Sequence, residues 1–136
     1  GVQRYAKKKR TGRGTTIMSQ TMPYTGVVLL IFVILHINAL KLGTHYEILV
    51  DGTAMRDIYR TTIEYFQNVW NVVWYVFAMF CAALHTSHGF ASAFQSMGWN
   101  HPKYYRKLEI AGYLYALFIG GGFAILSVWC HLKGGY

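Results

Sequence analysis

Charged residues are scarce in this chain, and acidic residues are the scarcest of them. Only five of its 136 residues are Asp or Glu, and all charged residues together make up 13%. That share is about half of what soluble domains carry. Hydrophobic residues make up 54%, and the mean hydropathy is +0.24. The composition therefore argues against a soluble domain and indicates a single membrane domain.

Cysteine is also rare, with only Cys81 and Cys130. No CxxC or CxxCH pattern is present, so neither a zinc site nor covalently attached haem is indicated. With a helical rise of ~1.5 Å per residue, the two cysteines lie on the order of 10 Å apart in membrane depth, which is too far for a disulfide. We expect both to be small buried hydrophobic residues.

Three apolar runs each approach the ~20 residues that a helix needs to cross a bilayer. They predict an all-α membrane protein with transmembrane helices over residues 23–42, 69–94 and 110–132. Pro23 suits the first turn of the first helix. Trp70, Trp74 and Tyr75 crowd the start of the second run, as in an aromatic belt at the membrane interface.

The remaining segments are more polar. They are a basic segment at 1–22, a connector at 43–68 and a basic loop at 95–109. In the connector, the sequence predicts a short interfacial helix over Met55–Gln67. In the basic loop, Pro102 is expected to break any helix.

Basic residues give the chain a net charge of +8, and six of its 13 Lys and Arg residues fall within the first 13 positions. A cluster of basic residues near a chain end often indicates a segment that binds nucleic acid. Beside three apolar runs we favour the positive-inside bias instead, and expect no nucleic-acid partner. The bias puts residues 1–22 and 95–109 on the cytoplasmic or matrix side. Residues 1–22, which contain no acid, also mimic a mitochondrial transit peptide.

Small residues recur every fourth position in the third run. The stripe consists of Gly112, Ala116, Gly120 and Ala124. Such a stripe lets another helix approach closely.

Two histidines, His36 and His85, lie inside the apolar runs, where ionisable side chains are costly and usually functional. Imidazole is a good axial ligand for haem, but a proton relay or a helix–helix hydrogen bond is an equally open alternative. His88 lies one helical turn from His85, a spacing that would also suit a metal site. No carboxylate or cysteine accompanies the two histidines, which argues against such a site. At ~1.5 Å per residue, His36 lies roughly 20 Å and His85 roughly 13 Å from the inner end, which favours separate irons.

Several sequence blocks resemble one known family. They are YAKKKRTGRGTT (5–16), SQTMPYTG (19–26), ILHINALK (34–41) and LHTSHGFASAFQSMGWNHPKYYR (84–106). The chain resembles the cytochrome b membrane-anchor subunit of succinate dehydrogenases and fumarate reductases, of the five-helix type that carries two haems. The match covers only the last three of the five helices.

The resemblance implies that His36 is an axial ligand of an outer haem b and His85 of an inner one. A second membrane chain would supply the other two helices and their histidines, completing a five-helix haem-binding bundle as a split subunit. His88, Arg13 and Ser87 are candidates for contacts behind the ligands or to haem propionates. The family commonly reads SRTMRWTG where this chain reads SQTMPYTG, so two arginines of that block are missing.

The resemblance further implies a subunit of succinate dehydrogenase that anchors a flavoprotein and an iron–sulfur subunit. Electrons from succinate would reach a quinone through haem b, and this chain would hold no succinate-oxidising site. Ser92, Gln95 and Trp99 are quinone candidates by position. The mitochondrial inner membrane is favoured over a bacterial cytoplasmic membrane. The alternatives are a cofactor-free structural membrane subunit and a fumarate reductase anchor working in the reverse direction.

Overall fold

The computed structural model describes residues 17–99 and 101–134. Of these described residues, 79% are helical. In chain order its elements are α1 (Ile17–His36), the π-helical turn η1 (Ile37–Lys41), β1 (Glu47–Val50), β2 (Thr53–Arg56), α2 (Ile58–Tyr65), α3 (Val69–Ser96) and α4 (Pro102–Lys133).

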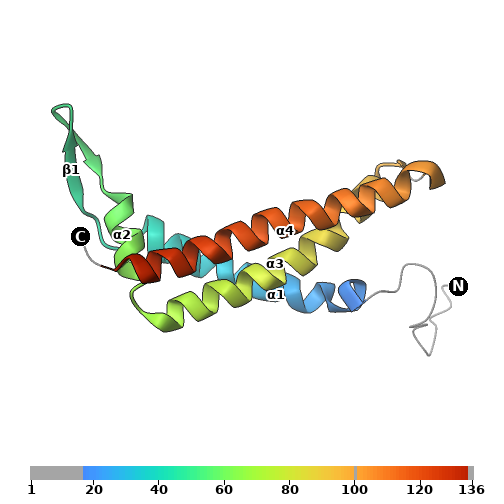
Figure 1. Ribbon diagram of the computed structural model, residues 1–136, viewed down its shortest axis with the longest axis horizontal. Coiled ribbons are helices and arrows are strands. Elements are labelled where there is room, and N and C mark those ends of the chain that lie inside the picture. The colour runs from blue at the N-terminus through green and yellow to red at the C-terminus, as the bar shows by residue number, and fades with distance from the viewer. Residues whose placement is uncertain (1–16, 100, 135–136) are drawn as a thin grey trace, which may run out of the picture.

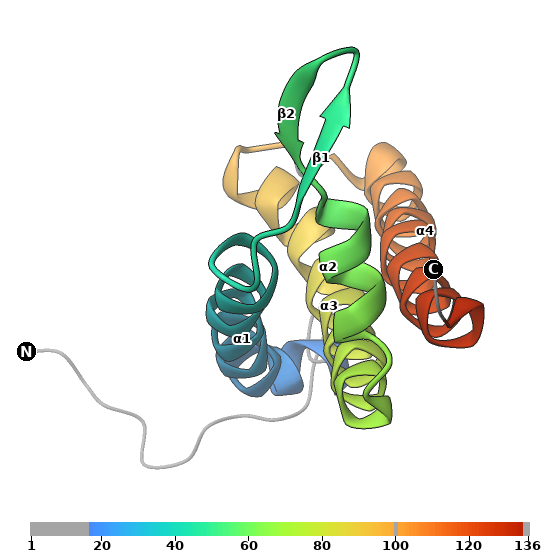
Figure 2. The same cartoon turned by 90° about the vertical axis from the view of Figure 1, so that its left-hand side faces the viewer.

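Three helical segments are long and apolar enough to cross a membrane, which confirms the prediction of three such spans. They are Gln20–Lys41, Val69–Ser96 and Pro102–Lys133. The helix α3 is central, with α1 packed along one side and α4 along the other (Figures 1 and 2). The connector with the two strands and α2 lies at one end, here called the hairpin end. The turn after α3, at 97–99, lies at the opposite end, called the loop end.

Glycines bring α3 and α4 together. A Cβ atom added at Gly120 would lie 3.0 Å from both the Met79 carbonyl oxygen and the Ala83 Cβ. One added at Gly112 would lie 3.1 Å from the Ser87 carbonyl oxygen. The small-residue stripe therefore faces α3, and the predicted close helix approach is confirmed within this chain.

Pro23 does not lie in the first turn of the first helix, so the role predicted for it is wrong. The helix α1 is already formed at Ile17, and Pro23 lies inside it. The Thr25 hydroxyl lies 3.1 Å from the carbonyl oxygens of Thr21 and Met22. Since threonine hydroxyls can bond backbone groups around a proline, an apolar helix tolerates proline at this position.

Pro102 does not break a helix, which is a second correction. It is the first residue of α4, where proline's missing N–H costs no hydrogen bond. His101 caps the helix, because its Nδ1 accepts a hydrogen bond from the Lys103 backbone N–H at 3.2 Å. The basic segment 95–109 is therefore largely helical, and α4 begins eight residues before the predicted start at 110.

The connector contains a β-hairpin, so the prediction of an all-α chain missed one element. Strands β1 and β2 pair antiparallel, with Val50 opposite Thr53. Asp51 and Gly52 both have positive φ, at 50° and 78°, as a two-residue type I′ turn requires. The Arg56 guanidinium donates hydrogen bonds to the carbonyls of Leu40 at 2.7 Å and Lys41 at 2.6 Å, which fixes the base of the hairpin to the end of the first span.

The short helix α2 falls inside the predicted range Met55–Gln67. Its N-cap is Asp57, whose side chain accepts a hydrogen bond from the Arg60 backbone N–H at 3.0 Å. Ile63, only 1% exposed, buries the inward side of α2 against the ends of the long helices. Both cysteines are free and buried, as expected.

Candidate functional site

Two side-chain hydrogen bonds connect α1 to α3, and each of them pairs a histidine with a hydroxyl. His36 Nδ1 on α1 lies 3.0 Å from the Tyr75 hydroxyl on α3. His85 Nδ1 on α3 lies 3.1 Å from Thr25 Oγ1 on α1. Each helix thus contributes one histidine and one hydroxyl to the same interface.

The two bonds lie at different levels of the bundle. His36 follows Thr25 by 11 residues on α1, and His85 follows Tyr75 by 10 residues on α3. At ~1.5 Å per residue, the histidines are about 15 Å apart along the bundle axis. His36 lies towards the hairpin end and His85 towards the loop end. Two axial ligands of one iron must face each other at one level, so His36 and His85 are too far apart in level to bind one iron together.

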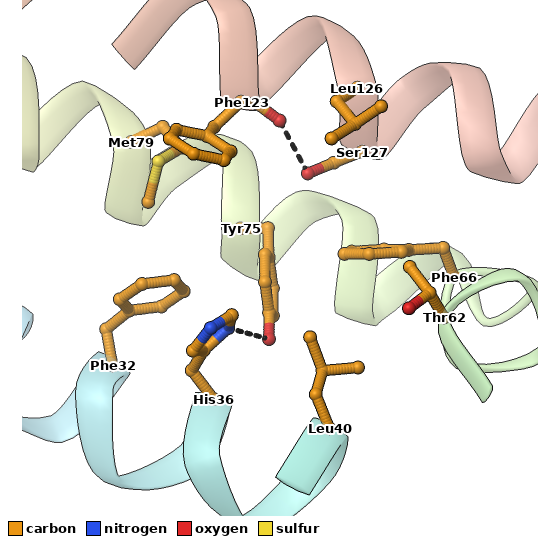
Figure 3. A pocket seen from close by; sticks show the side chains of 10 residues that line it. All are labelled: Phe32, His36, Leu40, Thr62, Phe66, Tyr75, Met79, Phe123, Leu126 and Ser127. Carbon is orange, nitrogen blue, oxygen red and sulfur yellow. Dashed lines mark hydrogen bonds between the residues drawn. The ribbon is translucent and has the colours of Figure 1, made fainter. Parts of the chain in front are cut away.

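His36 lies among aromatic rings (Figure 3). Phe32 stacks on its imidazole at a centroid distance of 5.4 Å. Tyr75, only 5% exposed, makes edge contacts with the rings of Phe32 at 4.9 Å and Phe66 at 4.8 Å. The hydrogen bond between His36 and Tyr75 is therefore shielded from water, which strengthens it.

A cavity of about 270 Å³ opens beside His36, between the three long helices and under α2 (Figure 3). Its walls are mainly apolar, and they are formed by Phe32, His36, Leu40, Thr62, Phe66, Tyr75, Met79, Phe123, Leu126 and Ser127. The Ser127 hydroxyl donates to the carbonyl of Phe123 at 2.8 Å. Pockets that enclose drug-sized ligands start near ~300 Å³. A haem held by His36 would therefore extend beyond this chain.

The histidine–hydroxyl pairs suit a metal ligand. A neutral imidazole has one N–H and one lone pair. When Nδ1–H donates to a hydroxyl, Nε2 keeps the lone pair that binds iron, as in most protein sites where histidine holds a metal. Within residues 17–99 and 101–134, no three His, Cys, Asp or Glu side chains gather into a cluster that would hold a metal without further ligands.

The surroundings of His85 are tighter. Gly26 on α1 passes close to it, since a Cβ added there would lie 3.5 Å from His85 Cε1. His85 is half-buried. His88 is half-buried too, one turn further along α3. The close passage of α1 thus singles out His85 rather than His88.

Ser87 lies on a different side of α3 from His85. It is 4% exposed, and its hydroxyl lies 2.9 Å from the Leu84 carbonyl oxygen. Its own carbonyl lies under Gly112 of α4. Because two residues correspond to a rotation of about 200° around a helix, Ser87 faces α4 while His85 faces α1.

The three quinone candidates all lie towards the loop end. Ser92 is half-buried and Gln95 is exposed on the last turns of α3. Trp99 is 63% exposed, and its indole stacks on Phe94 at a centroid distance of 5.4 Å. Arg13 lies outside the described residues.

Thr25 was not expected to be the partner of a histidine, and Tyr75 was expected only as part of an aromatic belt. Tyr75 is buried in an aromatic cluster. One signal was available for Thr25, because it belongs to the block 19–26 on which the family resemblance rests. Tyr75 carries no comparable local signal.

Comparison of the chain with family models, with curated proteins and with solved structures gave no match.

Proposed function

We propose that the chain is the C-terminal part of a cytochrome b membrane-anchor subunit of respiratory complex II. The observation that carries the proposal is the pair of histidines at two levels in the apolar helices, each with Nδ1 within hydrogen-bond distance of a hydroxyl on the facing helix. The sequence blocks that resemble the family include both histidines. A chain with two such ligands, about 15 Å apart, suits a protein that holds two haems.

Haem b, when bound, supplies a one-electron carrier inside the membrane. His36 and His85 would each provide one of its axial ligands, and the apolar walls beside His36 would exclude water. Burial and hydrogen bonding to the ligand are the means by which a protein sets a haem potential. Succinate oxidation belongs to the flavoprotein, and electrons would pass from the iron–sulfur subunit through this domain to a quinone. Ser92, Gln95 and Trp99 are the proposed quinone contacts.

The proposal requires a second membrane chain. Each histidine would supply one axial ligand at its level, and the cavity beside His36, at about 270 Å³, lies just below the ~300 Å³ at which pockets for drug-sized ligands begin. A partner with two helices and two further histidines would complete both sites and the five-helix bundle.

The loop end is the proposed docking side for the soluble subunits. The first turns of α4 carry Lys103, Arg106 and Lys107 there, and all three are exposed. By the positive-inside bias this end faces the matrix or cytoplasm. The mitochondrial inner membrane is the preferred location, with a bacterial cytoplasmic membrane second.

One observation favours the alternative of a cofactor-free structural subunit. Hydrogen bonds between a histidine and a hydroxyl also hold membrane helices together without any metal. An anchor of fumarate reductase would use the same histidines with the electron flow reversed.

Purification of the tagged chain from its native membranes in mild detergent separates these functions. We expect the flavoprotein, the iron–sulfur subunit and a second membrane chain to copurify, and the alkaline pyridine assay to detect b-type haem. Addition of succinate should reduce that haem. A preparation that contains all the partners and no haem would instead establish the structural subunit.

A further inference from the structure

We propose that Thr25 and Tyr75 are positioning residues, which set the tautomer and the basicity of His85 and His36 respectively. This inference rests on the proposed haem function. It assigns to each haem one hydroxyl, contributed by the neighbouring helix of this same chain.

Thr25 has a single hydroxyl proton and three oxygen or nitrogen neighbours for it. They are the carbonyl oxygens of Thr21 and Met22 and the Nδ1 of His85, each at 3.1 Å. If the proton goes to a carbonyl, the hydroxyl accepts from His85 Nδ1–H, and Nε2 carries the lone pair. If the proton goes to His85, Nε2 keeps its hydrogen and cannot bind iron. The carbonyls of Thr21 and Met22 can thus accept the threonine proton, and in that arrangement His85 Nε2 is free of hydrogen and able to bind iron.

Tyr75 faces His36 from within a cluster of aromatic side chains. Its ring is held by edge contacts with Phe32, Phe66 and Tyr65, the last at a centroid distance of 5.6 Å. These contacts orient the phenol, so that its oxygen stays 3.0 Å from His36 Nδ1. When the Tyr75 hydroxyl proton goes to Tyr65, to which its side chain is also hydrogen-bonded, the phenol oxygen accepts from His36 Nδ1–H as Thr25 does from His85.

The hydrogen bond has a predictable effect on redox behaviour. An imidazole that donates Nδ1–H is more basic at Nε2 and stabilises the ferric more than the ferrous iron. Removing the hydroxyl should therefore raise the reduction potential of one haem and leave the other unchanged. We expect a change of about tenfold in the ratio of ferrous to ferric haem at a fixed potential, which corresponds to about 59 mV for one electron.

The test is a potentiometric titration of the purified complex for the wild type, Thr25→Val, Thr25→Ser and Tyr75→Phe. Haem content per complex is measured alongside. Valine matches the shape of threonine without its hydroxyl, and serine restores the hydroxyl. Tyr115→Phe is the matched control for the phenol, because Tyr115 lies on α4, 49% exposed, beside Phe90 towards the loop end.

We expect Thr25→Val to raise the potential of one haem, Thr25→Ser to restore it, and Tyr75→Phe to raise the potential of the other. Wild-type potentials in Thr25→Val and Tyr75→Phe complexes that retain both haems would overturn the positioning role and leave the haem function standing. Loss of a haem from Thr25→Ser as well as from Thr25→Val would show that the hydroxyl does not suffice to hold the ligand, because serine retains it, and this result also overturns the inference. A wild-type complex without haem would refute the proposed function itself, and this inference with it.

Discussion

Thr25 Oγ1 and His85 Nδ1 lie 3.1 Å apart, although 60 positions separate them in the chain. Thr25 belongs to the block SQTMPYTG and His85 to the block LHTSHG. Two of the blocks that resemble one family therefore meet at a single hydrogen bond. The same interface holds the reciprocal pair of His36 and Tyr75 at the other level. Each of the two helices thus places a hydroxyl beside the histidine of the facing helix.

The α3–α4 contact should depend on Gly120 and not on its neighbour. Gly120→Val places methyl groups against the Met79 carbonyl and Ala83, where even a Cβ is at 3.0 Å. Overpacking of this kind costs about 1–3 kcal/mol, so the thermal unfolding midpoint of the purified complex should fall. Gly121→Val is the control, because a Cβ at Gly121 meets nothing within 4 Å. Equal midpoints for the two variants would contradict the packing described here.

Arg56 should hold the hairpin against the end of the first span. Arg56→Met keeps much of the side-chain length but removes both hydrogen bonds to the carbonyls of Leu40 and Lys41. Hydrogen bonds to a charged group contribute about 1.5–3 kcal/mol each when shielded, and less where exposed. We expect backbone amides of β1 and β2 to exchange with deuterium about tenfold faster. Arg106→Met, at the loop end, should leave hairpin exchange unchanged, and an equal effect of both variants would refute the anchor.

The stability that the Tyr46–Glu64 pair gives to the connector should depend on pH. The Tyr46 hydroxyl donates to the Glu64 carboxylate at 2.5 Å, and Arg60 Nε donates to the same group at 3.2 Å. The hydrogen bond from Tyr46, with a smaller contribution from Arg60, holds the pKa of Glu64 below its usual 4.5. The same bond raises the pKa of Tyr46 above its usual 10.0.

The two shifts act in opposite pH ranges. The stability from a lowered carboxyl pKa is present above pH 4.5 and is lost as the pH falls through the folded value. The stability from a raised phenol pKa is present below pH 10.0 and is lost as the pH rises through the folded value. The difference in unfolding midpoint between wild type and Tyr46→Phe should therefore be constant between these limits and shrink outside them. A difference that stays constant down to pH 3 would refute the coupling.

The sequence predicted the three spans because apolar run length is a local property. Helix ends were less predictable, since proline is compatible with both a helix start and a helix interior. Pro102 starts α4 and Pro23 lies inside α1, the reverse of the roles expected from their flanking residues. The hairpin had a local signal, because Asp51 and Gly52 form a typical type I′ turn pair between short runs of strand-compatible residues.

The candidate site was predictable only in part. The different depths of His36 and His85 followed from counting residues along helices, and the structure places them at different levels. Their partners depend on how α1 rotates against α3, and no periodicity in the chain specifies that rotation. Ser87 shows the same limit. It faces α4 because Gly112, some 25 residues further along the chain, packs against it, and no local pattern around Ser87 indicates this contact.

The central claim is that His36 and His85 bind two different haems. Its most direct test is a redox titration, with haem content, of the purified complex for the wild type, His36→Ala and His85→Ala. The account predicts two components in the wild type, loss of one in His36→Ala, and loss of the other in His85→Ala. Loss of the same component in both variants, or two haems retained in either, would contradict it.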